Sequence, residues 1–159
     1  MTAAATARRQ GARPGVAGIL GSASVVVGGL VAAVTSPLQL SHGSWAAAYL
    51  VLVNGVAQVA LGKAQAALAP TAPSRGVQAT QLAAWNVGGA AVIGGTLARM
   101  PLIVDVGGLL LAIALALMIR TVRGRTAGPR WAIWTYRLLL IIVLVSIPIG
   151  LLLAHARAA

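Results

Sequence analysis

Long apolar runs separated by short polar connections dominate the chain. Five of them approach the roughly 20 helical residues needed to cross a hydrocarbon core. They are continuous rather than alternating, which favours helices over the strands of a barrel. We expect an all-α integral membrane bundle of five transmembrane helices, forming one membrane domain over 1–159. The predicted helices cover 15–34, 45–62 (with an extension to 68 allowed), 79–98, 101–119 and 134–154, after a basic tail at 1–14.

The cations lie at the ends of these runs. With the N-terminus inside, ten of the twelve Lys and Arg residues fall on the inner side, and only Arg99 and Arg157 fall outside. This bias is the positive-inside pattern, so we expect an inner N-terminus and an outer C-terminus. The first run is longer than the apolar core of a signal peptide, so we expect it to remain as a span. The connection 99–101 is so short that helices three and four must form a tight hairpin, with Pro101 in the first turn.

The composition agrees with a membrane chain. Charged residues make up 8% and hydrophobic residues 59%, whereas soluble domains carry roughly 25% charged residues. The absence of cysteine excludes disulfides and thiolate metal sites. The net charge of +11 is explained by orientation in the bilayer, so the expected partner is lipid and not nucleic acid.

Small residues predict how the helices pack. The first helix has Gly, Ser and Ala on one side and bulky side chains on the other, so its small side should meet another helix. The third helix carries glycines at 88, 89, 94 and 95 around much of its circumference, which predicts a central position. The fifth is bulky nearly all round, which predicts a peripheral one. These glycine-rich faces of helices one and three could also receive a membrane-protein partner or a second copy of the chain.

Amide side chains lie within the second and third helices. Asn54, Gln58 and Gln65 share one face of helix two. At about 1.5 Å per residue, Gln58 and Asn86 reach the same depth, so we predict a hydrogen bond between them. Two interpretations stay open: the amides hold helices together, or they line a site for a solute or cofactor.

Asp105 is the single acidic residue, and it lies inside an apolar run. It is expected about 6 Å below the outer interface, facing the bundle. Tyr49 should lie at a similar depth, with Arg99 and Arg157 just above. Asp105 is therefore either a structural anion paired with one of these groups or an ion-handling group.

Two histidines, His42 and His155, are expected at the outer surface. Imidazoles can ligate haem iron or copper, which makes a haem-binding electron-transfer protein one hypothesis. Their spacing matches no metal motif, so we expect neither a metal nor a cofactor. The sequence shows no nucleophile with a base and an acid, no phosphate loop and no paired carboxylates. We therefore expect no enzymatic activity.

Three stretches carry a family resemblance: "HGSWAAAYLVLVNGVAQVALGKAQ" (42–65), "WNVGGAAVIGGTL" (85–97) and "VDVGGLLLAIAL" (104–115). They resemble small polytopic membrane proteins of high-GC bacteria. The resemblance covers helices two to four and implies a small bacterial membrane protein. The expected location is the bacterial cytoplasmic membrane, which the chain crosses several times. It implies no particular activity.

Two further hypotheses follow from these patterns. The first is an accessory or interaction subunit of a larger membrane assembly, because glycine-lined faces are abundant and catalytic groups are lacking. The second is a small solute or ion transporter using Asp105 with Asn54, Gln58 and Asn86. Five helices make a thin wall for a pathway, so such a transporter would act as an oligomer.

Overall fold

The computed structural model describes residues 15–69, 71–122, 131, 133–138 and 140–145, and these are helical apart from short connections. The helices are α2 (Val16–Thr35), α3 (Gly43–Tyr49), the π-helix η1 (Leu50–Ala57), α4 (Gln58–Leu68), α5 (Arg75–Leu97) and α6 (Pro101–Thr121). Residues 131, 133–138 and 140–145 are also helical. Segments α3, η1 and α4 run on as one helix, Gly43–Leu68. Among the described residues, three helices are long and apolar enough to cross a membrane: Val16–Thr35, Gly43–Leu68 and Pro101–Thr121.

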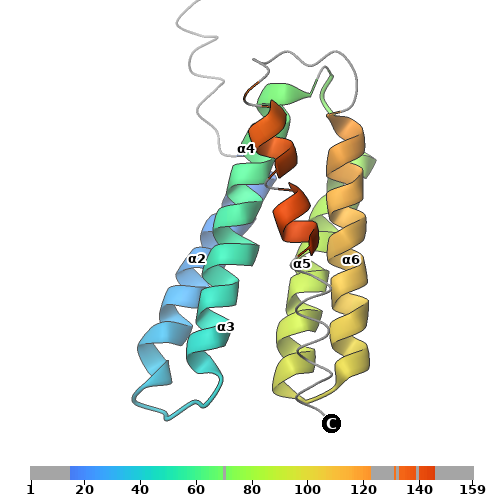
Figure 1. The fold of residues 1–159 in the computed structure, drawn as a ribbon. Coiled ribbons are helices and arrows are strands. Elements are labelled where there is room, and N and C mark those ends of the chain that lie inside the picture. The colour runs from blue at the N-terminus through green and yellow to red at the C-terminus, as the bar shows by residue number, and fades with distance from the viewer. Residues whose placement is uncertain (1–14, 70, 123–130, 132, 139, 146–159) are drawn as a thin grey trace, which may run out of the picture.

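Two helical hairpins form the fold (Figure 1). The first hairpin pairs α2 with the Gly43–Leu68 helix, and the second hairpin pairs α5 with α6. The helical segment within 131–145, drawn in orange-red, lies between them in this view. The backbone of the first hairpin approaches that of α5 mainly through η1. The predicted all-helical architecture is therefore confirmed, and the turns explain where its elements end.

The α5–α6 turn is as tight as the sequence predicts. Arg99 adopts a left-handed conformation with φ 55°, and the Met100 N–H donates to the Gly95 carbonyl over 2.8 Å. Pro101 occupies the first turn of α6, where its missing N–H is not needed. Helix α5 begins earlier than expected because Ser74 caps it, accepting a bond from the Val77 N–H over 3.4 Å.

Glycines bring the two helices of the first hairpin into backbone contact. A Cβ atom on Gly21 would lie 2.9 Å from the Gly55 carbonyl oxygen, and one on Gly28 would lie 3.0 Å from the Ala47 carbonyl oxygen. The bulky residues of α2 are exposed, as expected. The small side is only partly buried, which corrects the prediction, because Gly29 has nothing within 4 Å of its missing Cβ. A seven-residue spacing keeps Gly21 and Gly28 on the contact line, and Gly29 lies one position off it.

Glycines also bring the two helices of the second hairpin into backbone contact. Gly88 and Gly107 face one another: a Cβ on Gly88 would lie 2.9 Å from the Gly107 oxygen, and a Cβ on Gly107 would lie 2.7 Å from the Gly88 oxygen. Gly94 is exposed, with open space beside it. Helix α5 therefore contacts α6 on one side and η1 on another but keeps an open face. The expected central position of this helix is correct only in part, because it contacts helices of both hairpins but its glycines do not all face neighbours.

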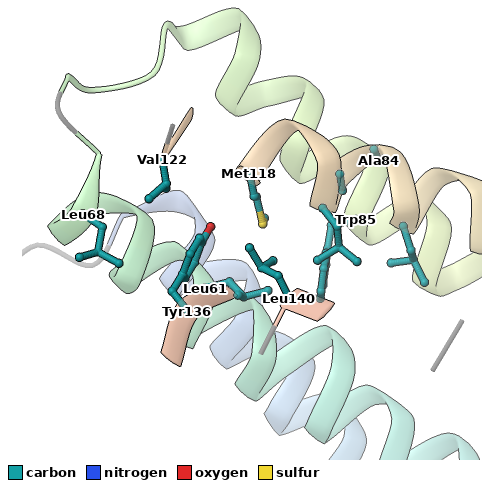
Figure 2. Close-up of a cluster of buried hydrophobic side chains, with 11 residues drawn as sticks. Leu61, Leu68, Ala84, Trp85, Met118, Val122, Tyr136 and Leu140 are labelled. Atoms are coloured by element: carbon teal, nitrogen blue, oxygen red, sulfur yellow. The ribbon is translucent and has the colours of Figure 1, made fainter. Parts of the chain in front are cut away.

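The hydrophobic core includes the C-terminal helical segment. Tyr136 and Leu140, which are 4% and 1% exposed, pack with Leu61, Trp85 and Met118 (Figure 2). These two residues are four positions apart and so share one helix face. The expected peripheral position is thus corrected: this segment buries one face and exposes the opposite one. The remainder of the predicted helix, 146–154, lies outside the described residues.

The glycine contacts predict a matched pair of substitutions. Gly107→Ala places a methyl group against backbone atoms of Gly88 and Val92, and such overpacking costs about 1–3 kcal/mol. Gly94→Ala meets open space and gains roughly 0.5–1 kcal/mol of helix propensity. We expect thermal unfolding in detergent, followed by tryptophan fluorescence, to show a lower Tm for the first variant and an unchanged or higher Tm for the second. Equal Tm values would contradict the close backbone contact.

Candidate functional site

One face of the Gly43–Leu68 helix turns three amides toward the second hairpin. Asn54, Gln58 and Gln65 are 5%, 0% and 7% exposed. Leu61 and Leu68 complete the same buried face. The steps of four, three, four and three residues are those of a helix presenting one line of side chains to a neighbour. The predicted common face of these amides is confirmed.

Helix α5 also has buried polar side chains on the face that meets the first hairpin. Gln81 and Trp85 are 2% and 0% exposed and lie one turn apart. Gly89 lies one turn further along the same face, and a Cβ there would overlap the Asn54 amide. The absence of a side chain at Gly89 therefore makes the room that Asn54 occupies.

Two contacts set the register between the hairpins. The Gln65 Nε2 donates to the Gln81 Oε1 over 3.2 Å and to the Thr121 Oγ1 over 2.5 Å. Near the middle of the same two helices, Asn54 lies against Gly89. Gln58 falls between these two anchors. In an antiparallel pair it therefore lies at the level of Trp85.

Buried polar atoms at this interface, both at the two anchors and between them, have no hydrogen-bond partners in the described part of the chain. We call the residues that bear them, together with Gln65 and Thr121, the inter-hairpin cluster. The unpartnered atoms are Asn54 Oδ1, Gln58 Oε1, Gln58 Nε2, Gln81 Nε2, Trp85 Nε1 and Tyr136 OH. Each such group costs about 1–3 kcal/mol when left unpaired in an apolar interior. A ligand that supplied the missing partners would recover that cost.

The π-helix η1 lies directly beside this cluster. It contains Asn54, and Gln58 follows its last residue. Gly55 lies in the same segment, with the Gly21 oxygen 3.1 Å from where its Cβ would be. A π segment inside an α-helix is rare and frequently marks a functional site, because the wider turn redirects side chains and weakens the regular ladder. Here it changes the helical phase at the position of the buried amides.

The predicted hydrogen bond between Gln58 and Asn86 is wrong. The Asn86 Nδ2 donates instead to the Leu82 carbonyl oxygen of its own helix over 2.8 Å, and its side chain is half-buried. Asn86 follows Trp85 immediately, so it points about 100° away from the face that meets Gln58. A hydrogen bond between these two residues requires equal depth in the membrane and also side chains that point toward each other. Gln58 and Asn86 meet only the first requirement.

Asp105 lies half-buried near the start of α6. The centre of the buried face of α6 passes through Val104 and Gly108, so Asp105 lies at its edge. Arg99 is exposed in the α5–α6 turn, and the ring of Tyr49 packs against Trp45 with centroids 5.6 Å apart. The other expected cation, Arg157, lies outside the described residues.

His42 is exposed just before α3, where its Nδ1 lies 2.9 Å from the Ser41 Oγ. His155 lies outside the described residues. Within the part of the chain that is described, no three His, Cys, Asp or Glu side chains gather closely enough to hold a metal ion.

Sequence reasoning missed four members of the cluster: Gln81, Trp85, Thr121 and Tyr136. The residues at 81, 85 and 89 recur every four positions, which is the helical signal that could have placed Gln81 and Trp85 on one face. Tyr and Trp are the residue types enriched at membrane interfaces, and Tyr136 lies in the sequence close to Trp131 and Trp134. Those two tryptophans are 71% and 68% exposed, whereas Tyr136 is buried.

Comparisons with known proteins give no relative for this chain: no family model, no curated protein and no solved structure matches it.

The cluster predicts opposite effects for two glutamines of one helix face. Gln58→Met removes two unpaired buried atoms and should raise the free energy of unfolding by about 1–3 kcal/mol. Gln65→Met takes away the donor to Gln81 and Thr121, so it should lower the same quantity. Thermal unfolding in detergent without added solutes measures both. If Gln58→Met proves as destabilising as Gln65→Met, the Gln58 amide is already satisfied and the candidate site fails.

Proposed function

We propose that this protein is a multi-pass membrane protein that binds a small polar solute between its two hairpins and conducts it across the bilayer. The observation that carries the proposal is the set of six unpartnered polar atoms buried in the inter-hairpin cluster. Buried polar groups in membrane bundles are costly and are characteristic of solute pathways. Neighbouring Gln65, Gln81 and Thr121 form hydrogen bonds in the same interface, so the middle of the cluster differs from ordinary interhelical bonding.

Five spans are part of this proposal. Helix α5 lies along α6, with close contacts at Gly88–Gly107 and at Gly95–Val104. A helix that accompanies a membrane-crossing neighbour in this way crosses with it. With 23 residues, α5 has a length of about 35 Å, which is sufficient. Its polar first turns then lie at the inner interface together with Lys63 and Arg75.

The proposed orientation has the N-terminus and the α4–α5 connection inside and the α2–α3 and α5–α6 turns outside, in the cytoplasmic membrane of a bacterium. The orientation is supported by the cation bias, and a bacterial membrane is what the resemblance implies.

The chain lacks cysteine, so single cysteines can report this topology. In intact cells we expect a membrane-impermeant maleimide to label Ser41→Cys in the α2–α3 turn and to leave Ser74→Cys before α5 unlabelled until the cells are opened. The reverse pattern would contradict the orientation. Labelling of both positions from outside would contradict the proposed number of spans.

The proposed pathway keeps Asn54, Gln58 and Asp105, which the sequence predicts, and adds three residues from the inter-hairpin cluster. Gln58, Gln81, Trp85 and Tyr136 hold the solute, and Asn54 closes the site toward the outer end. Asn86 is left out, because its amide is bonded within its own helix. The contact of Val92 with Gly107 puts Asp105 roughly one turn further out than Asn54. There it would act at the outer end of the pathway.

Flux measurements test this function. In proteoliposomes, we expect a panel of small polar solutes to include at least one that enters faster than into protein-free liposomes. Gln58→Met should reduce that flux about tenfold or more, since it removes hydrogen bonds worth roughly 0.5–1.5 kcal/mol each. Asn86→Ala is the matched control and should retain it. No accelerated solute, or equal loss in both variants, would contradict the proposal.

An accessory subunit of a larger assembly is the second candidate. Most of the glycines that suggested a partner protein contact other helices of the same chain. These are Gly21, Gly28, Gly88 and Gly107. Gly29 and Gly94 still face open space, and they favour a partner helix at those positions. This candidate is favoured if the protein conducts no solute and a second polypeptide remains bound to it after extraction from native membranes in mild detergent.

A further inference from the structure

The chemistry of the inter-hairpin cluster narrows the class of solute, and this step rests on the proposed function. Its unpartnered atoms comprise both kinds of hydrogen-bonding group. Two are carbonyl acceptors, on Asn54 and Gln58. Three are N–H donors, on Gln58, Gln81 and Trp85, and the Tyr136 hydroxyl can serve either way. A ligand that satisfies them must itself carry acceptors and donors.

Gln58 gives the strongest evidence that the ligand carries both a donor and an acceptor. Both heteroatoms of its carboxamide are unpartnered, and the side chain is 0% exposed. A carboxamide places an acceptor and a donor side by side in one plane. Its natural complement is a second planar group with N–H and C=O side by side, because two hydrogen bonds then form together.

The remaining atoms extend that complementarity. The register puts Trp85 opposite Gln58, with Gln81 one turn toward the inner end and Asn54 one turn toward the outer end. The Trp85 and Gln81 N–H groups can donate to the second lone pair of a solute carbonyl, and the Asn54 oxygen can accept from a further N–H. Each of these three side chains is at least nine-tenths buried.

The lack of charged side chains in the cluster favours a neutral solute over an ion. The described residues of the cluster are amides, a hydroxyl, an indole and a phenol, and none carries a formal charge. The described cations are all exposed: Lys63, Arg75, Arg99, Arg120 and Arg137. An ion entering this cluster would lose its hydration without a counter-charge there, which costs far more than the loss incurred by a neutral polar molecule.

We infer that the inter-hairpin cluster binds a small uncharged amide or urea. The solute lies against Gln58, which bonds both its carbonyl oxygen and an N–H. Trp85 and Gln81 donate to the carbonyl oxygen, and Asn54 accepts from the opposite N–H.

Three planar species of closely similar shape provide the test: urea, guanidinium and nitrate. Urea is neutral with donors and an acceptor, guanidinium is a cation with donors only, and nitrate is an anion with acceptors only. Uptake of isotope-labelled forms into proteoliposomes is measured by mass spectrometry, with glycerol as an uncharged polyol. We expect urea uptake to exceed that of protein-free liposomes about tenfold or more and to be lost in Gln58→Met, as hydrogen-bond energies of this size imply. Guanidinium, nitrate and glycerol should enter at the background rate.

The possible outcomes distinguish failure of the proposed solute class from failure of the proposed conduction. Faster entry of guanidinium or nitrate than of urea would overturn the neutral class while leaving solute conduction in place. Glycerol entering as fast as urea would overturn the amide complementarity in the same way. If none of the four enters faster than background, the inference fails; conduction itself fails only if the wider solute panel also gives no Gln58-dependent flux.

Discussion

A buried amide in a membrane bundle must find a hydrogen-bond partner or lose the free energy of its hydration. Two glutamines of one helix face meet this constraint differently. Near the C-terminal end of α4, Gln65 bonds both Gln81 and Thr121, which ties the first hairpin to α5 and α6 at once. In the middle, Gln58 has no partner among the described residues. One helix face therefore contains both a structural contact and an unsatisfied site, and the proposed function depends on that difference.

The glycines bring the helix backbones together within each hairpin and leave the contact between the hairpins to larger side chains. Within each hairpin the backbones touch, through Gly21 and Gly55 in the first and through Gly88 and Gly107 in the second. Small residues are thus used inside the hairpins, as is usual where lipid provides no hydrophobic drive between helices. Between the hairpins, larger side chains such as Trp85 and Tyr136 fill the space. Gly89 is the exception, and it accommodates the Asn54 amide.

Long apolar runs predicted the helices well, because their length and caps are local properties of the chain. The shared face of Asn54, Gln58 and Gln65 followed from helical spacing for the same reason. Pairing across helices was harder. Asn86 has the right depth but the wrong direction, and its amide is satisfied by Leu82 within α5. The π-helix η1 left no signal in the apolar pattern, since it depends on tertiary contacts such as that of Gly55 with Gly21. Tyr136 resembled an interfacial residue because composition alone does not show which face a helix buries.

Side-chain ¹⁵N NMR of the reconstituted protein tests most directly whether the unpartnered Gln58 amide binds a ligand. The Gln58 signal is identified by its loss in Gln58→Met, and the Asn86 signal serves as an internal reference. We expect urea to shift the Gln58 signal in a saturable way and to leave the Asn86 signal in place. A Gln58 signal that stays unchanged with urea, guanidinium, nitrate and glycerol alike would contradict ligand binding at this amide.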